Sequence, residues 1–294
     1  MMEEEYDDYI SRVNDQLESL AETIEPSELS EAVKHVTLSG GKRLRPILTL
    51  LASEAVNRDD DDTETADKAI RFAAGVEFVH TSALVADDVI DRSRVRRGVP
   101  TVHERYDHDM AVLSSNILLG KALETIDDKQ AVRAMVDAVK KLGEGEAMEL
   151  SEDLETVEDY ETLAYRKTAA LFVAATEVGA IAGDATEEEK KHLKNYARHL
   201  GIAFQIRDDV LDFTSSQDDL GKPVGRDAIL ERPSIVVIHS RNQDVRLVDS
   251  VEFARNRAQE HVDEAKNALE QLDTEGGPVE KLERITEFTV ERNR

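Results

Sequence analysis

Apolar residues recur at helical spacing along most of the chain. The first such run covers residues 7–24, and its apolar positions are Ile10, Val13, Leu17, Leu20 and Ile24. A long run extends from Ala66 to Asp91 without a proline. Because residues that repeat every three or four positions form one face of a helix, both runs predict helices.

The same spacing predicts helices elsewhere, with glycine or proline at their ends. The remaining predicted ranges are 27–38, 111–126, 130–150, 156–183, 187–213, a helix that begins at 235–239, and 245–294 with a break at Gly276-Gly277-Pro278. Alternating apolar and polar positions never extend beyond a few residues, and we find no hairpin signal. We therefore expect an all-α fold in one domain. The polar segment 214–227, TSSQDDLGKPVGRD, is expected to be a loop and a candidate lid.

The chain is strongly acidic, with 63 Asp and Glu against 37 Lys and Arg in 294 residues and a formal net charge of −26. Such a charge repels nucleic acid and anionic membrane surfaces, and it is typical of a protein adapted to high salt. The absence of cysteine excludes disulfides and thiolate metal sites. No signal peptide and no apolar run of about 20 residues is evident, so we expect a cytoplasmic protein without a membrane span.

Two aspartate triads share one spacing: Asp87, Asp88 and Asp91 in ADDVIDRSRVRR, and Asp208, Asp209 and Asp212 in FQIRDDVLDF. In each triad the first and third carboxylates lie one helical turn apart on one face. Crowded carboxylates repel one another unless hard cations such as Mg²⁺ bind between them. The alternative is a solvated acidic run such as Asp59–Asp62, but apolar residues flank both triads. Two such helices facing each other across a cavity would hold a diphosphate through metal ions.

Basic and polar residues supply further candidates. In GGKRLRP, a glycine pair precedes Lys42, Arg43 and Arg45, an arrangement that suits a phosphate, although basic turns are often plain surface. His80 lies seven residues before Asp87 on the same helix face, where an ordinary structural histidine is the alternative. In YRKTAALF, Lys167 and Thr168 are polar groups in an apolar setting, which requires a partner or a purpose.

These segments together resemble the trans-isoprenyl diphosphate synthases, also called polyprenyl synthetases, over nearly the whole chain. The matching signatures are GGKRLRP, VEFVHTSALVADDVIDRSRVRRGVPTVH, YRKTAALF, GIAFQIRDDVLDF and GKPVGRD, in family order. The resemblance implies one synthase domain over residues 1–294, built as a bundle of long antiparallel helices around a deep apolar cavity, the isoprenoid synthase fold. It also implies a homodimer.

The implied reaction joins isopentenyl diphosphate to an allylic diphosphate (dimethylallyl, geranyl or farnesyl) through ionisation, condensation and proton elimination, with release of diphosphate. Metal ions and fixed cations stabilise the leaving anion, and an apolar cavity keeps water from the carbocation. The resemblance implies three Mg²⁺ per active site.

The roles that the resemblance assigns fall into four groups. Mg²⁺ is held by Asp87, Asp88, Asp91, Asp208, Asp209 and Asp212; the allylic diphosphate by Arg96, Lys167 and Lys222; isopentenyl diphosphate by Lys42, Arg45, His80 and Arg97; and the path of the cation is lined by Thr168 and Gln205. The chain departs from the family pattern at Asn116, at Glu146 and Glu149, and at 231–234, where a family lysine is absent and Arg232 is a candidate substitute.

Product length is expected to depend on residues one or two turns before Asp87. Ser82 and Ala83 are small where short-chain relatives carry Phe or Tyr, so the next obstruction on this helix is Phe78. We therefore expect geranylgeranyl diphosphate or a longer product. The alternative is that Ser82 and Ala83 are small for helix packing and another helix closes the cavity.

Three other functions are alternatives: a terpene cyclase on the same fold, a non-catalytic synthase subunit and an acidic helical scaffold. Cyclases usually replace the second aspartate motif, and non-catalytic subunits usually lose one of the two. Both motifs are intact here, which favours the synthase.

Overall fold

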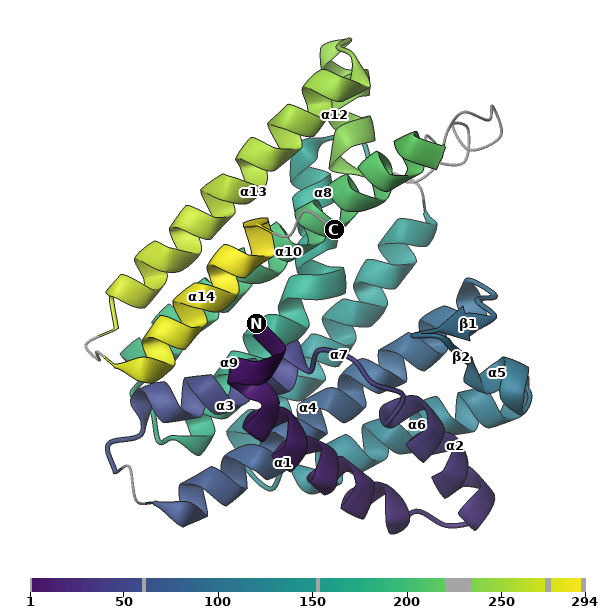
Figure 1. The fold of residues 1–294 in the computed structure, drawn as a ribbon, viewed down its shortest axis with the longest axis vertical. Coiled ribbons are helices and arrows are strands. Elements are labelled where there is room, and N and C mark those ends of the chain that lie inside the picture. Colours follow the sequence, from purple (N-terminus) through teal and green to yellow (C-terminus); the bar gives the residue numbers. More distant parts are fainter. Residues whose placement is uncertain (1, 60–61, 152–153, 220–233, 273–275, 292–294) are drawn as a thin grey trace. The chain divides into compact units, whose positions relative to one another are not determined.

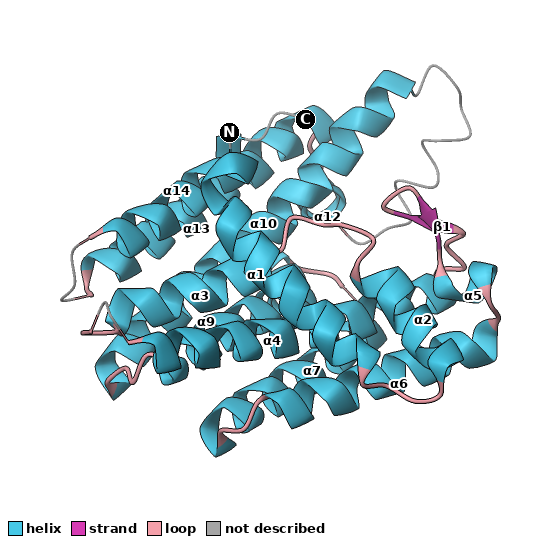
Figure 2. Cartoon of the chain, turned by 60° about the horizontal axis from the view of Figure 1, so that its bottom comes forward, coloured by secondary structure: helices cyan, strands magenta, loops and turns pink. Residues whose placement is uncertain are grey.

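The computed structural model describes residues 2–59, 62–151, 154–219, 234–272 and 276–291. As expected, helices account for nearly all of this part of the chain, with one small pair of strands (Figure 2). The elements are α1 (Met2–Glu22), α2 (Ser27–Thr37), α3 (Leu44–Val56), α4 (Thr63–Ile90), β1 (Val95–Arg96), β2 (Val99–Pro100), α5 (Val102–Arg105), α6 (His108–Thr125), α7 (Lys129–Leu150), α8 (Val157–Ala164), the π-helical turn η1 (Tyr165–Ala169), α9 (Ala170–Ala182), α10 (Glu187–Asp219), α12 (Ile235–Gln243), α13 (Leu247–Glu270) and α14 (Gly277–Glu291) (Figure 1).

The chain forms two compact units that interleave in the sequence. Unit 1 consists of Met1–Val136 and Ala174–Thr186, and unit 2 of Asp137–Val173 and Glu187–Arg294. The division falls within α7 and within α9. The single synthase domain expected for residues 1–294 stays a prediction.

Unit 1 is built around α4, which packs against α1, α3 and α6. Among the residues that the structure describes, α4 is the one helix long and apolar enough to cross a membrane by length and composition. It is mostly buried inside the protein, and Phe72 and Phe78 are fully enclosed, as in the core helix of a globular protein. The later part of α9 lies on α3, where a Cβ at Gly179 would meet the Thr49 carbonyl oxygen at 2.0 Å.

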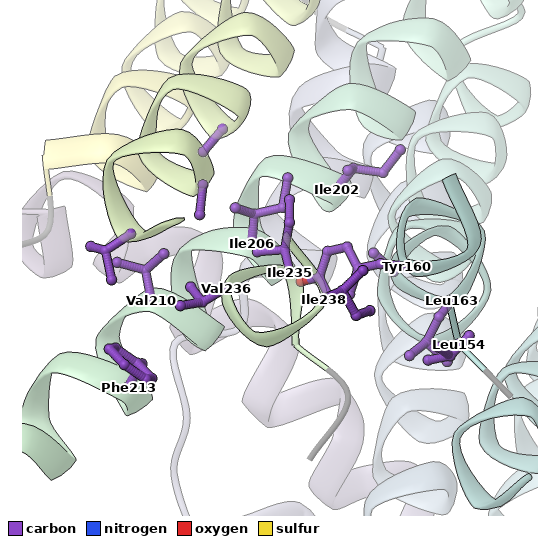
Figure 3. Packing of buried hydrophobic residues seen from close by; sticks show 14 of the residues in the cluster. Leu154, Tyr160, Leu163, Ile202, Ile206, Val210, Phe213, Ile235, Val236 and Ile238 are labelled. Atoms are coloured by element: carbon purple, nitrogen blue, oxygen red, sulfur yellow. The ribbon is translucent and has the colours of Figure 1, made fainter. Parts of the chain in front are cut away.

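Unit 2 is built around α10 and α13, which pack along each other and against α12 and α14. Its core gathers apolar side chains from α8, α10, α12 and α13, and Figure 3 shows Ile206, Ile235 and Ile238 around the ring of Tyr160. The tyrosine is 1% exposed. This core surrounds the part of α10 that carries the second aspartate triad.

Besides the one-turn helix α5, which no predicted range includes, two elements differ from expectation. β1 and β2 form an antiparallel hairpin whose turn residues, Arg97 and Gly98, have positive φ angles of 53° and 79°. The sequence pattern did not predict it, because each strand has only two residues and shows no alternation. α10 continues to Asp219, so residues 214–219 of the expected loop are helical; no glycine or proline interrupts the chain before Gly221. The rest of that candidate lid lies outside the described residues.

Candidate active site

The first triad lies at the end of α4 in unit 1. Asp88 is 2% exposed, and its Oδ1 accepts a hydrogen bond from Nε of Arg96 at 2.7 Å. Burial raises the pKa of Asp88, although the Arg96 guanidinium opposes the shift. Asp91 is exposed and Asp87 partly exposed, one turn apart. The middle carboxylate therefore turns inward, and the outer two remain on one accessible face.

The β1–β2 hairpin brings Arg97 to the glycine pair that precedes α3. Arg97 donates a hydrogen bond to the carbonyl of Gly40, and its guanidinium lies against Gly41. A Cβ at Gly41 would lie 2.6 Å from Arg97 Cζ, and Gly41 has a φ of 123°. The backbone conformation at position 41 therefore favours glycine, and the absence of a side chain lets the guanidinium lie against the turn.

Arg45 and His80 meet between α3 and α4. Nη1 of Arg45 lies 3.2 Å from Nε2 of His80. Burial lowers the pKa of His80 well below its usual value, and the positive charges of Arg45 and Arg97 add to this effect. His80 is therefore neutral near pH 7, with Nε2 able to accept from the arginine. Lys42 is exposed on the same turn as Gly41, so four residues expected to bind one diphosphate belong to one region of unit 1.

Of the residues proposed to set product length, Phe78 and Ser82 share one face of α4, whereas Ala83 lies on a neighbouring one. Oγ of Ser82 donates to the Ser115 carbonyl at 2.9 Å, and Oγ of Ser115 donates back to the Ser82 carbonyl at 3.2 Å, so Ser82 faces α6. Phe78 is completely buried. Ala83 is partly exposed and lies one turn before Asp87 on its face.

The second triad lies in α10 of unit 2. Asp209 accepts hydrogen bonds from the Tyr160 hydroxyl at 2.6 Å and from Nε2 of Gln205 at 2.9 Å. Burial raises the pKa of Asp209 to about 7 against these two bonds, which lower it. Asp208 is partly exposed and Asp212 exposed, one turn apart. The second triad thus resembles the first: hydrogen bonds hold its middle carboxylate against Tyr160 and Gln205, and its first and third carboxylates are accessible.

The π-helical turn η1 positions Thr168 against α10. Its hydroxyl donates to Oε1 of Gln205. The two segments cross closely, because a Cβ at Gly201 would lie 2.5 Å from Cα of Ala169. A π-turn inside a helix often marks a functional site, and this one connects Thr168, Gln205 and Asp209 in a single hydrogen-bonded chain.

Lys167 meets the two glutamates at which the sequence departs from the family pattern. Its Nζ bonds to Glu149 and lies 3.4 Å from Oε2 of Glu146, both on α7. α7 approaches η1 closely, since a Cβ at Gly145 would lie 2.8 Å from the backbone nitrogen of Lys167. The sequence predicted that Lys167, a charged residue in an apolar segment, needs a partner, and the structure shows that this partner is a pair of carboxylates.

The donor set fits Mg²⁺. Within the described ranges, no three acidic or histidine side chains converge into a preformed metal site. Mg²⁺ usually keeps several waters and binds one or two carboxylates together with substrate phosphates. Asp87 with Asp91, and Asp208 with Asp212, each offer such a pair of carboxylates on one helix face.

Some site residues could not be found from sequence, and others cannot be placed. Tyr160, which bonds Asp209, follows the apolar spacing of α8 and carried no signal of this contact. The sequence showed Glu146 and Glu149 as departures from the family pattern, but it did not show that they contact Lys167. Lys222 and Arg232 lie outside the described residues.

Comparison with known proteins gives consistent results. A family model described as polyprenyl synthetase matches residues 26–272. A short chain isoprenyl diphosphate synthase from Methanothermobacter thermautotrophicus is 35% identical, over 97% of this chain and 96% of its own. The structure of geranylgeranyl pyrophosphate synthetase from Pyrococcus horikoshii is similar with a TM-score of 0.86 and 31% identity, covering 99% and 98% of the two chains. That of heptaprenyl diphosphate synthase from Staphylococcus aureus has a TM-score of 0.86 and 30% identity, covering 98% of each.

Proposed function

Because the chain belongs to the polyprenyl synthetase family and is a trans-prenyltransferase, we propose that it joins isopentenyl diphosphate to dimethylallyl, geranyl or farnesyl diphosphate and releases diphosphate. The observation that carries this proposal is the repeated triad geometry, in which the first and third aspartates of both motifs remain accessible. The relatives are named as synthases, which disfavours a terpene cyclase or a non-catalytic subunit.

Most of the proposed site residues bind one of the two diphosphates, and others stabilise the carbocation. Lys42, Arg45 and Arg97, with neutral His80, bind isopentenyl diphosphate. The outward aspartates Asp87, Asp91, Asp208 and Asp212, and Arg96, Lys167 and Lys222, serve the allylic diphosphate. Mg²⁺, which this family generally uses, supplies charge neutralisation for the leaving diphosphate when bound, with three ions per active site.

The inward groups orient the outward ones. Asp88 holds Arg96, and Asp209 holds Gln205. Since the Thr168 hydroxyl donates a hydrogen bond to Oε1 of Gln205, the lone pairs of the hydroxyl oxygen remain available to a developing carbocation. No side-chain nucleophile is required.

The direct test uses the purified protein with Mg²⁺, radiolabelled isopentenyl diphosphate and each allylic primer in turn. Prenols are resolved by length after dephosphorylation. We expect label in elongated prenols. A cyclase would form hydrocarbon from the primer without incorporating label, and a scaffold or inactive subunit would form neither.

We further propose a homodimer in the cytoplasm, on two grounds. α6 exposes Val112, Leu113 and Leu123, each at least 39% accessible, and such a row of apolar side chains suits a second copy of the chain. The high negative charge suits a protein dissolved in a salt-rich cell interior. Sedimentation equilibrium should give twice the mass of the chain.

The net charge of −26 predicts that the stability and the activity of the protein depend on salt concentration. At low ionic strength, like charges across the surface repel one another and destabilise the compact state, and salt screens this repulsion. We expect the thermal midpoint and the activity to rise with KCl toward molar concentrations. A midpoint that is independent of KCl would contradict adaptation to salt.

The carboxylates around Lys167 predict a change in affinity for the allylic substrate. Glu149→Gln removes a negative charge that competes with the diphosphate for the lysine. The pair is partly exposed, so its strength is about 0.2–1 kcal/mol, and we expect KM for the allylic diphosphate to fall by up to about fivefold. The KM for isopentenyl diphosphate should not change.

The matched control is Glu144→Gln, which removes a carboxylate of α7 that lies 3.9 Å from Arg166 instead of Lys167. This variant should leave both KM values unchanged. A higher allylic KM in Glu149→Gln would show that the glutamate orients the lysine rather than competing for it.

A further inference from the structure

The second residue of the KRLR segment has a different environment from its neighbours. Lys42 is exposed and Arg45 half-buried, whereas Arg43 is 3% exposed. Arg43 also has a positive φ of 50° at the position that caps α3, a conformation that costs free energy for any residue with a side chain. Its side chain therefore points into unit 1 while the residues on either side remain at the surface.

The guanidinium of Arg43 connects three helices. Nη1 bonds to Oε1 of Glu77 on α4 at 2.6 Å, Nε to Oδ1 of Asn14 on α1 at 2.9 Å, and Nη2 to the carbonyl of Thr37 at the end of α2 at 2.6 Å. The Arg43 and Glu77 side chains are 1% and 2% exposed. A guanidinium has its donors in a rigid fork, so these bonds define the direction of the side chain and hence the backbone at position 43.

The buried Arg43 side chain and its partners lie beside every residue of unit 1 that is assigned to isopentenyl diphosphate. Glu77 precedes His80 by three residues on α4, one turn away on a neighbouring part of the helix surface. Position 43 immediately follows Lys42, and two residues later comes Arg45, which contacts His80. Arg97 closes the other side of the turn through Gly40 and Gly41. A shift of residue 43 would therefore move the cations on both sides relative to His80.

We propose that Arg43 is a positioning residue for the isopentenyl diphosphate half-site: its buried bonds to Glu77, Asn14 and Thr37 hold the glycine turn so that Lys42 and Arg45 converge with His80 and Arg97. Arg43 itself does not contact the substrate, because its donors are directed into the protein. This role rests on the proposed function of the four surrounding residues.

If Arg43 only stabilised the fold, its replacement would affect stability but not substrate binding. A double variant distinguishes this structural role from the positioning role. Arg43→Met alone leaves the Glu77 carboxylate buried without its cation, and we expect the thermal midpoint to fall sharply. Arg43→Met combined with Glu77→Leu replaces the pair by apolar side chains of similar size, an exchange that is often neutral for stability. It also leaves the net charge unchanged, so long-range attraction of the anionic substrate is preserved.

We expect the double variant to recover the wild-type thermal midpoint but to raise KM for isopentenyl diphosphate at least tenfold. KM for the allylic diphosphate should stay within twofold of wild type. Tyr9→Phe is the control, because it removes a bond between α1 and α3, to Glu54 at 2.7 Å, without touching the glycine turn. A stable double variant with normal KM for isopentenyl diphosphate overturns the proposal.

Two further variants complete the test. If the double variant does not fold, Arg43→Lys decides, because lysine keeps a charge for Glu77 but cannot reach Asn14 and Thr37 together; KM for isopentenyl diphosphate should rise at least threefold, and an unchanged value overturns the proposal. Arg45→Ala tests the half-site itself. If Arg45→Ala leaves this KM unchanged, the assigned half-site is wrong; if Arg45→Ala raises it and the Arg43 variants do not, only the positioning role is wrong.

Discussion

Asp87→Ala and Asp208→Ala are each expected to lower kcat by about a thousandfold or more, which corresponds to about 4 kcal/mol in the activation barrier. Each substitution removes one carboxylate of an outward pair that we propose would hold a divalent cation for the leaving diphosphate. The inward contacts of Asp88 and Asp209 remain in these variants. Steady-state turnover at saturating Mg²⁺, with circular dichroism to verify helix content, measures the effect.

Acidic residues outside the triads serve as controls in this chain of high negative charge. Asp109 in α6 and Asp263 in α13 are exposed, and their replacement by alanine should leave turnover within about twofold of wild type. Near-normal turnover in Asp87→Ala or Asp208→Ala at saturating Mg²⁺ would mean that the metal site has been assigned to the wrong residues.

Ala83→Phe is expected to shorten the main product while the enzyme remains active. Ala83 lies one turn before Asp87 on the same face and is partly exposed, so a ring at this position would project next to the first triad. A tail of four or more isoprene units would then lose its path. The lengths of the dephosphorylated prenols, resolved by chromatography, measure the change, and Ala83→Leu should give an intermediate distribution.

Ser82→Phe should shorten the product too, but at a cost in stability. Ser82 bonds to Ser115 on α6, so a ring at position 82 must enter the α4–α6 packing, and overpacking of this kind costs about 1–3 kcal/mol. If both phenylalanine variants leave the distribution of prenols unchanged, another segment closes the cavity and neither residue determines product length. The similarity of this fold to both geranylgeranyl and heptaprenyl synthases agrees with a length set by a few side chains rather than by architecture.

The properties that sequence determined are those that depend on neighbours along the chain. Helical period placed Asp87 with Asp91, and Asp208 with Asp212, because residues four apart in a helix share a face whatever surrounds them. It also located most helices, and the order of the signatures indicated the family. The glycine pair before Lys42 was recognised as a turn for the same local reason.

Only the tertiary structure decided which polar side chains turn inward. Arg96 and Asp88 are 8 residues apart, Lys167 and Glu149 18, Arg43 and Glu77 34, and Tyr160 and Asp209 49. No periodic pattern connects such positions, because each pair depends on how two separate segments pack. Arg43 stands between two proposed substrate ligands in the sequence, yet the fold buries it, since a guanidinium reaches whichever acceptors the surrounding helices place near it.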